Sequence, residues 1–195
     1  MIAGHFGFAA GVKSRETATP LWALMLATIW LDVVFVPLFI MKIETVVPIQ
    51  GYHQTYGGAF IYAAYTHSLV GAALLSVVAG CAGKLAWGLR SGLVIGLVAF
   101  SHWVLDLVVH HPDLAILPGN LGNLPLLGFG LWNWPIPAAL AELALVLTGG
   151  GLYWRAASSV ARQAGHHQRL ARLSGFLVIL FGIAVLGLDF SGVLG

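Results

Sequence analysis

The stretch "WGLRSGLVIGLVAFSHWVLDLVVHHPD", residues 87–113, decides the fold class of this protein. From residue 87 to 109 it is an almost unbroken apolar run, and an α-helix needs about 20 such residues to cross a bilayer. Its last part nevertheless holds three histidines and two aspartates. Ionisable side chains are costly inside lipid, so their position is a first indication of function.

Composition places the rest of the chain in the same class. Apolar residues make up 59% and charged residues 8% of the sequence, and the mean hydropathy is +0.91. A soluble domain carries about 25% charged residues. No charged or Ser/Pro-rich linker divides the chain, so we expect a single integral membrane domain over residues 1–195. The net charge of +2 and the scattered basic residues give no indication of a nucleic-acid partner.

Five apolar segments predict an all-α, polytopic membrane helix bundle. They cover about residues 20–41, 57–80, 87–109, 134–154 and 170–190, each long enough at 1.5 Å per residue to span the hydrocarbon core. Residues 1–12 are too short to cross and predict an N-terminal re-entrant or interfacial helix. Pro37 predicts a kink in the first span. Residues 110–133 are rich in Pro and Gly and predict an extracytoplasmic loop.

The basic residues indicate the orientation of this bundle. Lys42 alone falls on one side of the predicted spans. The other side carries Lys13, Arg15, Lys84, Arg90, Arg155, Arg162, Arg169 and Arg172. By the positive-inside rule the basic loops lie in the cytoplasm. We therefore expect a multi-pass protein of the inner, cytoplasmic membrane with its C-terminus outside.

Ionisable residues recur at one depth in the predicted bundle. They are His5 in the short first helix and Asp32, His67, His102, Asp106 and Glu142 in the spans. At 1.5 Å per residue their heights agree within about 10–12 Å, between mid-membrane and the outer third. This agreement predicts one shared site. His102 and Asp106 lie on one helix face and either grip the same cation or form a hydrogen-bonded pair that serves packing alone.

A metal-dependent reaction is the first functional hypothesis. His67 and His102, with a carboxylate from Asp32 or Asp106, would hold a divalent ion such as Zn²⁺, which lowers the pKa of a coordinated water to about 7. The remaining carboxylate or Glu142 would act as general base, so Asp32 and Glu142 are the candidate catalytic residues. A site inside the membrane, open toward the outer leaflet, indicates a lipid or lipid-linked substrate.

Several motifs also resemble those of a known family. "GHFGFAAG", the aspartate at 32, "YTHSL" and "HWVLDLVVHHPD" followed by "LPG" are similar to the bacterial inner-membrane metal-dependent hydrolases of the YdjM type, the LexA-binding membrane hydrolase-like proteins. The resemblance covers roughly residues 4–120. It implies a metal site made of His5, Asp32, His67, His102 and Asp106. The chain departs from the family at "LDVV", where a DxD pair is common, and at "IYAAYTHS", where a His-Arg pair often precedes the THS motif.

Other functions stay open at the level of sequence. Carboxylates and histidines at mid-depth also fit a small ion or metal transporter. His67 and His102 would suit the axial positions of a haem. A non-catalytic accessory subunit would use the same polar groups only to specify helix packing. The glycines at 88, 92 and 96 permit close helix contact within one chain or in a homodimer.

Overall fold

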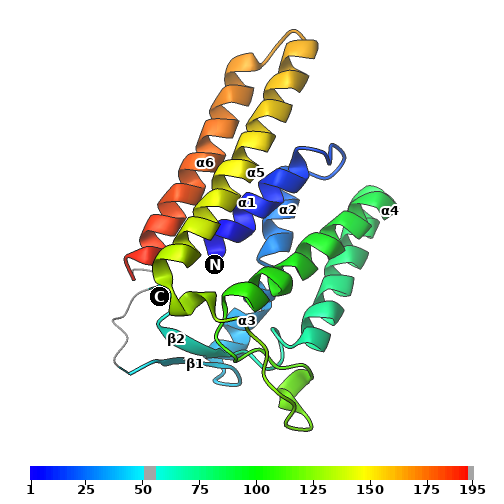
Figure 1. Cartoon of the computed structure of the whole chain (residues 1–195). Helices are drawn as coiled ribbons and strands as arrows, with labels where there is room; N and C mark the ends of the chain where they lie inside the picture. The colour runs from blue at the N-terminus through cyan, green and yellow to red at the C-terminus, as the bar shows by residue number, and fades with distance from the viewer. Residues whose placement is uncertain (51–55, 193–195) are drawn as a thin grey trace.

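The computed structural model describes residues 1–50 and 56–192, and Figure 1 shows a helical bundle with a small β-hairpin at one end. The helices and strands follow the order α1 (Ile2–Lys13), α2 (Leu21–Thr28), α3 (Trp30–Ile40), β1 (Thr45–Pro48), β2 (Ala59–Tyr62), α4 (Leu69–Val109), the 3₁₀ turns η1 (Pro118–Asn120) and η2 (Leu131–Asn133), α5 (Pro135–Gln163) and α6 (Gln168–Phe190). The all-α class is confirmed apart from the two short strands.

Three helices, α4, α5 and α6, are long and apolar enough to cross a membrane. The pair α2 and α3 adds a fourth span if this bent pair counts as one. Five separate spanning helices are therefore not found in the described residues. The predicted fourth and fifth spans lie in α5 and α6, and α5 continues to Gln163, beyond the predicted end.

The third predicted span and residues 69–80 of the second lie in α4, which is 41 residues long and turns back on itself at Gly88 (φ 86°, ψ 174°). Figure 1 shows its two limbs, residues 69–87 and 89–109, side by side. Glycines permit this contact, since a methyl group on Gly92 would come within 2.6 Å of the Gly80 carbonyl oxygen. Each limb is about 30 Å long at 1.5 Å per residue, so α4 is a helical hairpin.

The predicted start of the second span, residue 57, is wrong. Residues Ala59–Tyr62 form β2, which pairs antiparallel with β1, Thr45 opposite Tyr62. Their aromatic and β-branched side chains favour a strand, but a continuous apolar run conceals the change from strand to helix. The helix begins at Leu69, where the Ser68 side chain accepts a hydrogen bond from the Gly71 backbone N–H at 3.1 Å.

The predicted kink at Pro37 is also wrong, because the break lies between α2 and α3 at Ile29 and bends the pair by 48°. Pro37 stays inside α3. At the break, the Thr28 hydroxyl donates to the His5 carbonyl oxygen at 3.2 Å, and the Thr28 carbonyl oxygen accepts from His102 Nδ1 at 2.7 Å. The His102 side chain thus satisfies the Thr28 carbonyl oxygen at the bend, and the Thr28 side chain ties the bend to α1.

The predicted N-terminal helix is confirmed as α1, and it lies within the bundle against α5, α2 and α6 (Figure 1). Six of its residues are buried. Glycines make the contact with α5 close, since a Cβ atom on Gly149 would collide with the backbone of Gly7. Its depth in a membrane stays a prediction.

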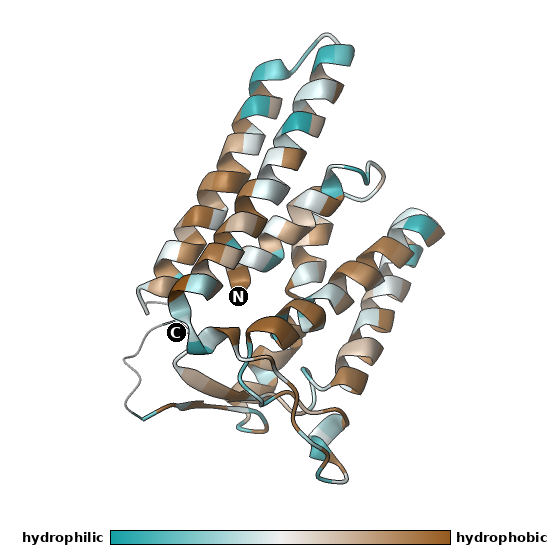
Figure 2. Ribbon diagram, viewed as in Figure 1, coloured by the Kyte–Doolittle hydropathy of each residue, from teal (hydrophilic) through white to brown (hydrophobic). Residues whose placement is uncertain are grey.

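Most Lys and Arg residues lie in or near three connections at one end of the molecule. In Figure 1 the α1–α2 connection, the turn of α4 and the α5–α6 turn lie toward the top, whereas the β-hairpin and residues 110–133 lie at the bottom. Figure 2 shows hydrophilic residues gathered at the upper ends of the helices and apolar residues below them. Large hydrophobic side chains such as Leu85 (88% exposed) and Leu97 (71%) face outward, as in a protein surrounded by lipid.

Candidate metal centre

A cluster of histidines and aspartates lies where four parts of the chain meet. His5 comes from α1, Asp32 from the first turn of α3, His67 from the residues just before α4, and His102 and Asp106 from the second limb of α4. The structure thus brings together all five residues predicted for the metal site. Four are buried, and the Asp32 side chain is 38% exposed. Their role as ligands stays a prediction.

Two overlapping triads within this cluster have side-chain atoms close enough to hold one metal ion. The first is Asp32, His67 and His102, and the second is His5, His102 and Asp106. In the first triad, Asp32 Oδ1 lies 3.4 Å from His67 Nε2 and 3.5 Å from His102 Nε2. The two Nε2 atoms are 3.2 Å apart. These separations bring three ligand atoms from three segments around one point.

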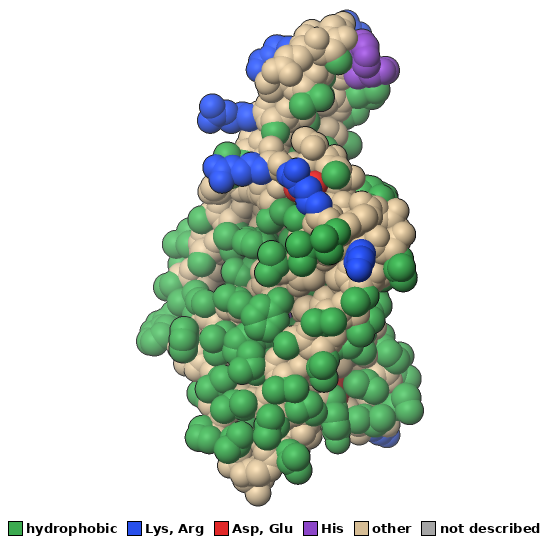
Figure 3. Space-filling view, turned by 90° about the vertical axis from the view of Figure 1, so that its right-hand side faces the viewer, with side chains coloured by type: hydrophobic (Ala, Val, Ile, Leu, Met, Phe, Trp, Pro, Cys, Tyr) green, Lys and Arg blue, Asp and Glu red, His purple; other side chains and the backbone are tan. Residues whose placement is uncertain are grey.

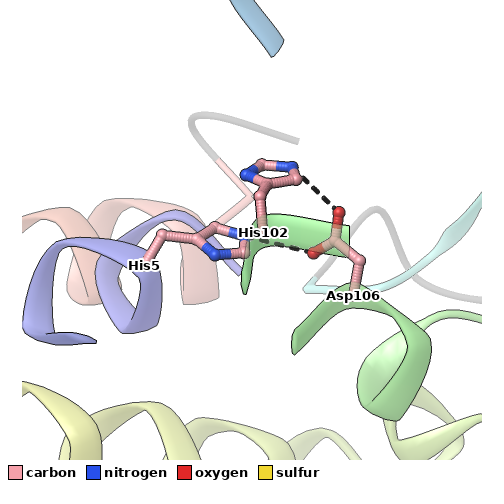
Figure 4. Close-up of side chains that lie close together, drawn as sticks. All are labelled: His5, His102 and Asp106. Atoms are coloured by element: carbon pink, nitrogen blue, oxygen red, sulfur yellow. Dashed lines mark hydrogen bonds and ion pairs between the residues drawn. The ribbon is translucent and has the colours of Figure 1, made fainter. Parts of the chain in front are cut away.

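The second triad depends on Asp106, whose two oxygens contact different histidines. Oδ1 lies 3.1 Å from His5 Nε2, and Oδ2 lies 3.0 Å from His102 Nε2 (Figure 4). The imidazoles of His5 and His102 are stacked, with centroids 3.9 Å apart and an angle of 12° between their planes. The nitrogen lone pairs lie in the ring planes. In two stacked, nearly parallel rings the lone pairs therefore point in parallel planes and do not converge on one metal ion. The angle of 60° between the His67 and His102 rings suits convergence better.

The outer nitrogens of His67 and His102 have partners that fix their tautomers. His102 Nδ1 lies 2.7 Å from the Thr28 carbonyl oxygen, so this nitrogen carries the proton and donates it. The Thr66 hydroxyl donates to Glu44 Oε2 at 2.8 Å, so it accepts from His67 Nδ1, also at 2.8 Å. Both neutral rings therefore present an Nε2 lone pair to the centre of the cluster.

The centre of the cluster is consequently a group of acceptors. Two imidazole lone pairs face the Asp32 carboxylate, and His67 Nε2 and His102 Nε2 lie 3.8 and 3.0 Å from Asp106 Oδ2. Groups that only accept hydrogen bonds repel each other in a buried setting unless a positive charge lies between them. A metal ion or added protons on the imidazoles supply that charge.

Two further buried acids, Glu44 and Asp113, contact residues beside the cluster, and the sequence analysis did not assign them to the site. Glu44 is 1% exposed and accepts from the backbone N–H groups of Tyr65 and Thr66 at 2.7 and 2.8 Å, in addition to the Thr66 hydroxyl. Asp113 accepts from His110 Nδ1 at 3.0 Å. The polar residues at 110–113 could have indicated this acid from the sequence. For Glu44 no local pattern in "KIETVV" indicates that it points inward.

Glu142, the other predicted catalytic residue, is fully buried but makes a different set of contacts. Its carboxylate accepts from the Gly4 backbone N–H at 3.0 Å and from the Tyr56 hydroxyl, and it lies 4.0 Å from the N-terminal amino group. These contacts attach α1 and Tyr56, in the connection between β1 and β2, to α5. The structure does not bring Glu142 into either triad.

Comparison of the chain with known protein-family models, with curated proteins and with solved structures gave no match. The assignment of function therefore depends on the geometry of the cluster. The resemblance to the YdjM-type hydrolases stays a prediction.

Proposed function

We propose that this protein is a membrane-embedded, metal-dependent hydrolase that acts on a lipid or lipid-linked substrate. The single observation that carries the proposal is the triad of Asp32, His67 and His102. Its atoms are separated by 3.2, 3.4 and 3.5 Å. In a tetrahedral zinc site with bonds of about 2.0–2.1 Å, ligand atoms lie about 3.3–3.4 Å apart. The triad matches one face of such a tetrahedron.

Three protein ligands leave a fourth position, which is the pattern of catalytic rather than structural zinc sites. When bound, a divalent ion would supply Lewis acidity and lower the pKa of a coordinated water. The outer hydrogen bonds of His67 and His102 support this assignment, because such a bond on each imidazole is the usual arrangement in metal sites.

Asp106 is the group best placed to act as general base. Its Oδ2 atom lies 3.0 Å from His102 Nε2, beside the triad, and can accept a proton from a water molecule there. His5 Nε2 donates to the other oxygen at 3.1 Å and so orients the carboxylate. This proposal gives the base role to Asp106 in place of Glu142, and it makes His5 a positioning residue for Asp106.

The exposure of Asp32 supports a substrate that enters from the lipid. Asp32 is the only member of the triad with substantial exposure, and the exposed neighbours on α3 are apolar, namely Val33 (40%), Val36 (51%) and Phe39 (44%). A soluble polar substrate would have to cross this apolar surface. A lipid that carries a hydrolysable bond near its headgroup lies along it already.

The proposal includes the orientation of the bundle in the membrane. The end that carries the Lys- and Arg-rich connections would face the cytoplasm of a bacterial cell, in its inner membrane. The cluster would then lie toward the opposite, outer leaflet.

Elemental analysis of the purified protein tests the proposal. We expect about one equivalent of a transition metal per chain in the wild type, and its loss in the His67→Ala and His102→Ala variants. His166→Ala, at the exposed α5–α6 turn, is the matched control and should retain the metal. The wild type should also release product from a panel of lipid phosphates and esters, and His67→Ala should not. Absence of metal would contradict the site, whereas metal without hydrolysis would contradict the enzymatic assignment alone.

A further inference from the structure

A cleft at the basic end of the bundle is separate from the metal centre. It lies between α1, the second limb of α4 and α5, and its volume is about 590 Å³, within the range of about 300–1,000 Å³ typical of small-ligand sites. Arg90 at its mouth precedes His102 by twelve positions on one helical limb, which corresponds to about 18 Å. A ligand group at this mouth is therefore remote from the cluster of His and Asp residues.

The walls of the cleft are mostly apolar. Much of the lining comes from glycines and aliphatic residues: Gly7, Gly11, Gly149, Val94, Leu145 and Leu152. The glycines on α1 and α5 lie where the two backbones touch, so no side chain rises from this part of the wall. Such a surface fits a long unbranched hydrocarbon chain and offers few groups that would fix a polar ligand.

Two arginines lie at the mouth of the cleft. Arg15 is exposed on the α1–α2 connection, and Arg90 lies at the start of the second limb of α4. Arg90 Nε donates to Glu16 Oε2 at 3.0 Å, and buried Glu16 also accepts from the Ala18 backbone N–H at 2.8 Å. These bonds hold the Arg90 guanidinium beside the cleft.

Glu16 stays ionised in this arrangement. Burial alone would raise the pKa of its carboxyl group, but the hydrogen bonds from the backbone of Ala18 and Thr19 and from Arg90 bring the pKa below its ordinary value. One carboxylate and two guanidinium groups line the mouth, so its net charge is positive. Figure 3 shows the wider pattern, in which most visible Lys and Arg side chains gather toward one end of a largely hydrophobic face.

We propose that this cleft binds one anionic phospholipid, with an acyl chain along the glycine-lined wall and the phosphate between Arg15 and Arg90. The charge of the mouth is complementary to the phosphate, and the apolar wall is complementary to the chain. The cleft opens beside helices long and apolar enough to span a membrane, where lipid is the solvent. The proposal does not depend on metal binding or on hydrolysis.

Thermal unfolding of the purified protein in detergent tests this proposal. Phosphatidylglycerol should raise the melting temperature by about 5 °C at a hundredfold excess over its Kd. Phosphatidylcholine, which has no net charge, should have a much smaller effect. Glycerol phosphate, which carries the phosphate without a chain, should have none. The same lipid should be found by mass spectrometry in protein purified from membranes.

Two variants separate the chain site from the phosphate site. Thr148→Trp places a large ring in the cleft and should abolish the shift with phosphatidylglycerol, and Leu152→Trp serves the same purpose if the first variant does not fold. Arg15→Gln should weaken lipid binding about tenfold, which corresponds to one charge-assisted contact. Arg162→Gln, near the end of α5, is the matched control and should leave the shift unchanged. Equal shifts with both lipids, or a full shift in the tryptophan variants, would overturn the proposal.

Discussion

Glu142 and Asp106 are two buried acids that contact consecutive residues of α1, yet their surroundings differ in kind. Glu142 accepts from the Gly4 backbone N–H, and Asp106 contacts the His5 side chain. All the close partners of Glu142 are donors, including the Tyr56 hydroxyl. Asp106 accepts from His5 Nε2 through one oxygen, but its other oxygen and nearby Asp32 face the Nε2 atoms of His67 and His102, whose outer nitrogens carry the ring protons.

This difference separates a structural acid from a candidate functional one. An acid whose neighbours donate hydrogen bonds is satisfied by the fold and needs nothing further. A buried acid whose neighbours also accept is not satisfied until a cation or a proton arrives. Burial alone does not distinguish the two cases, since Glu142 is 0% and Asp106 3% exposed. The polarity of the neighbours does.

The largest expected effect is a split between the two aspartates of the cluster. Asp32→Asn should lose the metal and all hydrolysis, because a ligand is gone. Asp106→Asn should keep most of the metal but lower kcat about 10²–10⁴-fold, because the general base is gone. Metal content and kcat measured on the same preparations check this, and equal metal loss in both variants would assign Asp106 to the metal instead.

Glu142→Ala should lower the stability of the fold and leave the metal content unchanged. Removal of this buried acceptor leaves the Tyr56 hydroxyl and the Gly4 N–H without their partner, at a cost of about 3 kcal/mol in the free energy of unfolding. Metal content per folded protein should not change. A denaturant titration gives the first quantity and elemental analysis the second. Loss of metal without loss of stability would show that Glu142 belongs to the site after all.

The hydrogen bonds from His67 to Thr66 and from Thr66 to Glu44 should raise the metal affinity. Thr66→Val removes the hydroxyl that accepts from His67 Nδ1, so we expect a fall of about 10–100-fold in affinity. Competition with a chelator of known affinity measures it. Thr66→Ser keeps the hydroxyl and should recover most of the affinity, whereas equal effects of both substitutions would indicate packing.

The smallest effect concerns Glu16, another buried acid that accepts hydrogen bonds from the groups around it. Glu16→Gln should lower the free energy of unfolding by about 1 kcal/mol at neutral pH. Because the folded-state pKa lies below the ordinary value of 4.5, the stabilisation is present above that value and is lost as the pH falls through the folded-state pKa. The wild type and the variant should therefore converge below about pH 4.5. A constant difference down to pH 3 would contradict this assignment.

The sequence predicted that the five residues of the cluster lie close together, because helix rise and the positions of Lys and Arg gave them similar expected heights. It did not predict which way each side chain faces around its helix. Glu142 was expected at a similar height, but its carboxylate contacts Tyr56 and Gly4. The rotation of a helix depends on packing against neighbours that are remote in sequence. The buried position of Glu44 and the strand β2 were not predicted for the same reason, because their partners are remote in sequence.

The bend at Ile29 also constrains how the chain matures. The carbonyl oxygen of Thr28, released by the break, is satisfied by His102, a residue synthesised more than seventy positions later. Until the second limb of α4 has been synthesised, α2 and α3 therefore lack this partner for the Thr28 carbonyl oxygen. The imidazole that completes the bend is the same one that faces the two aspartates. One side chain thus links the bend between α2 and α3 to the cluster, and this link forms only after the second limb of α4 has been synthesised.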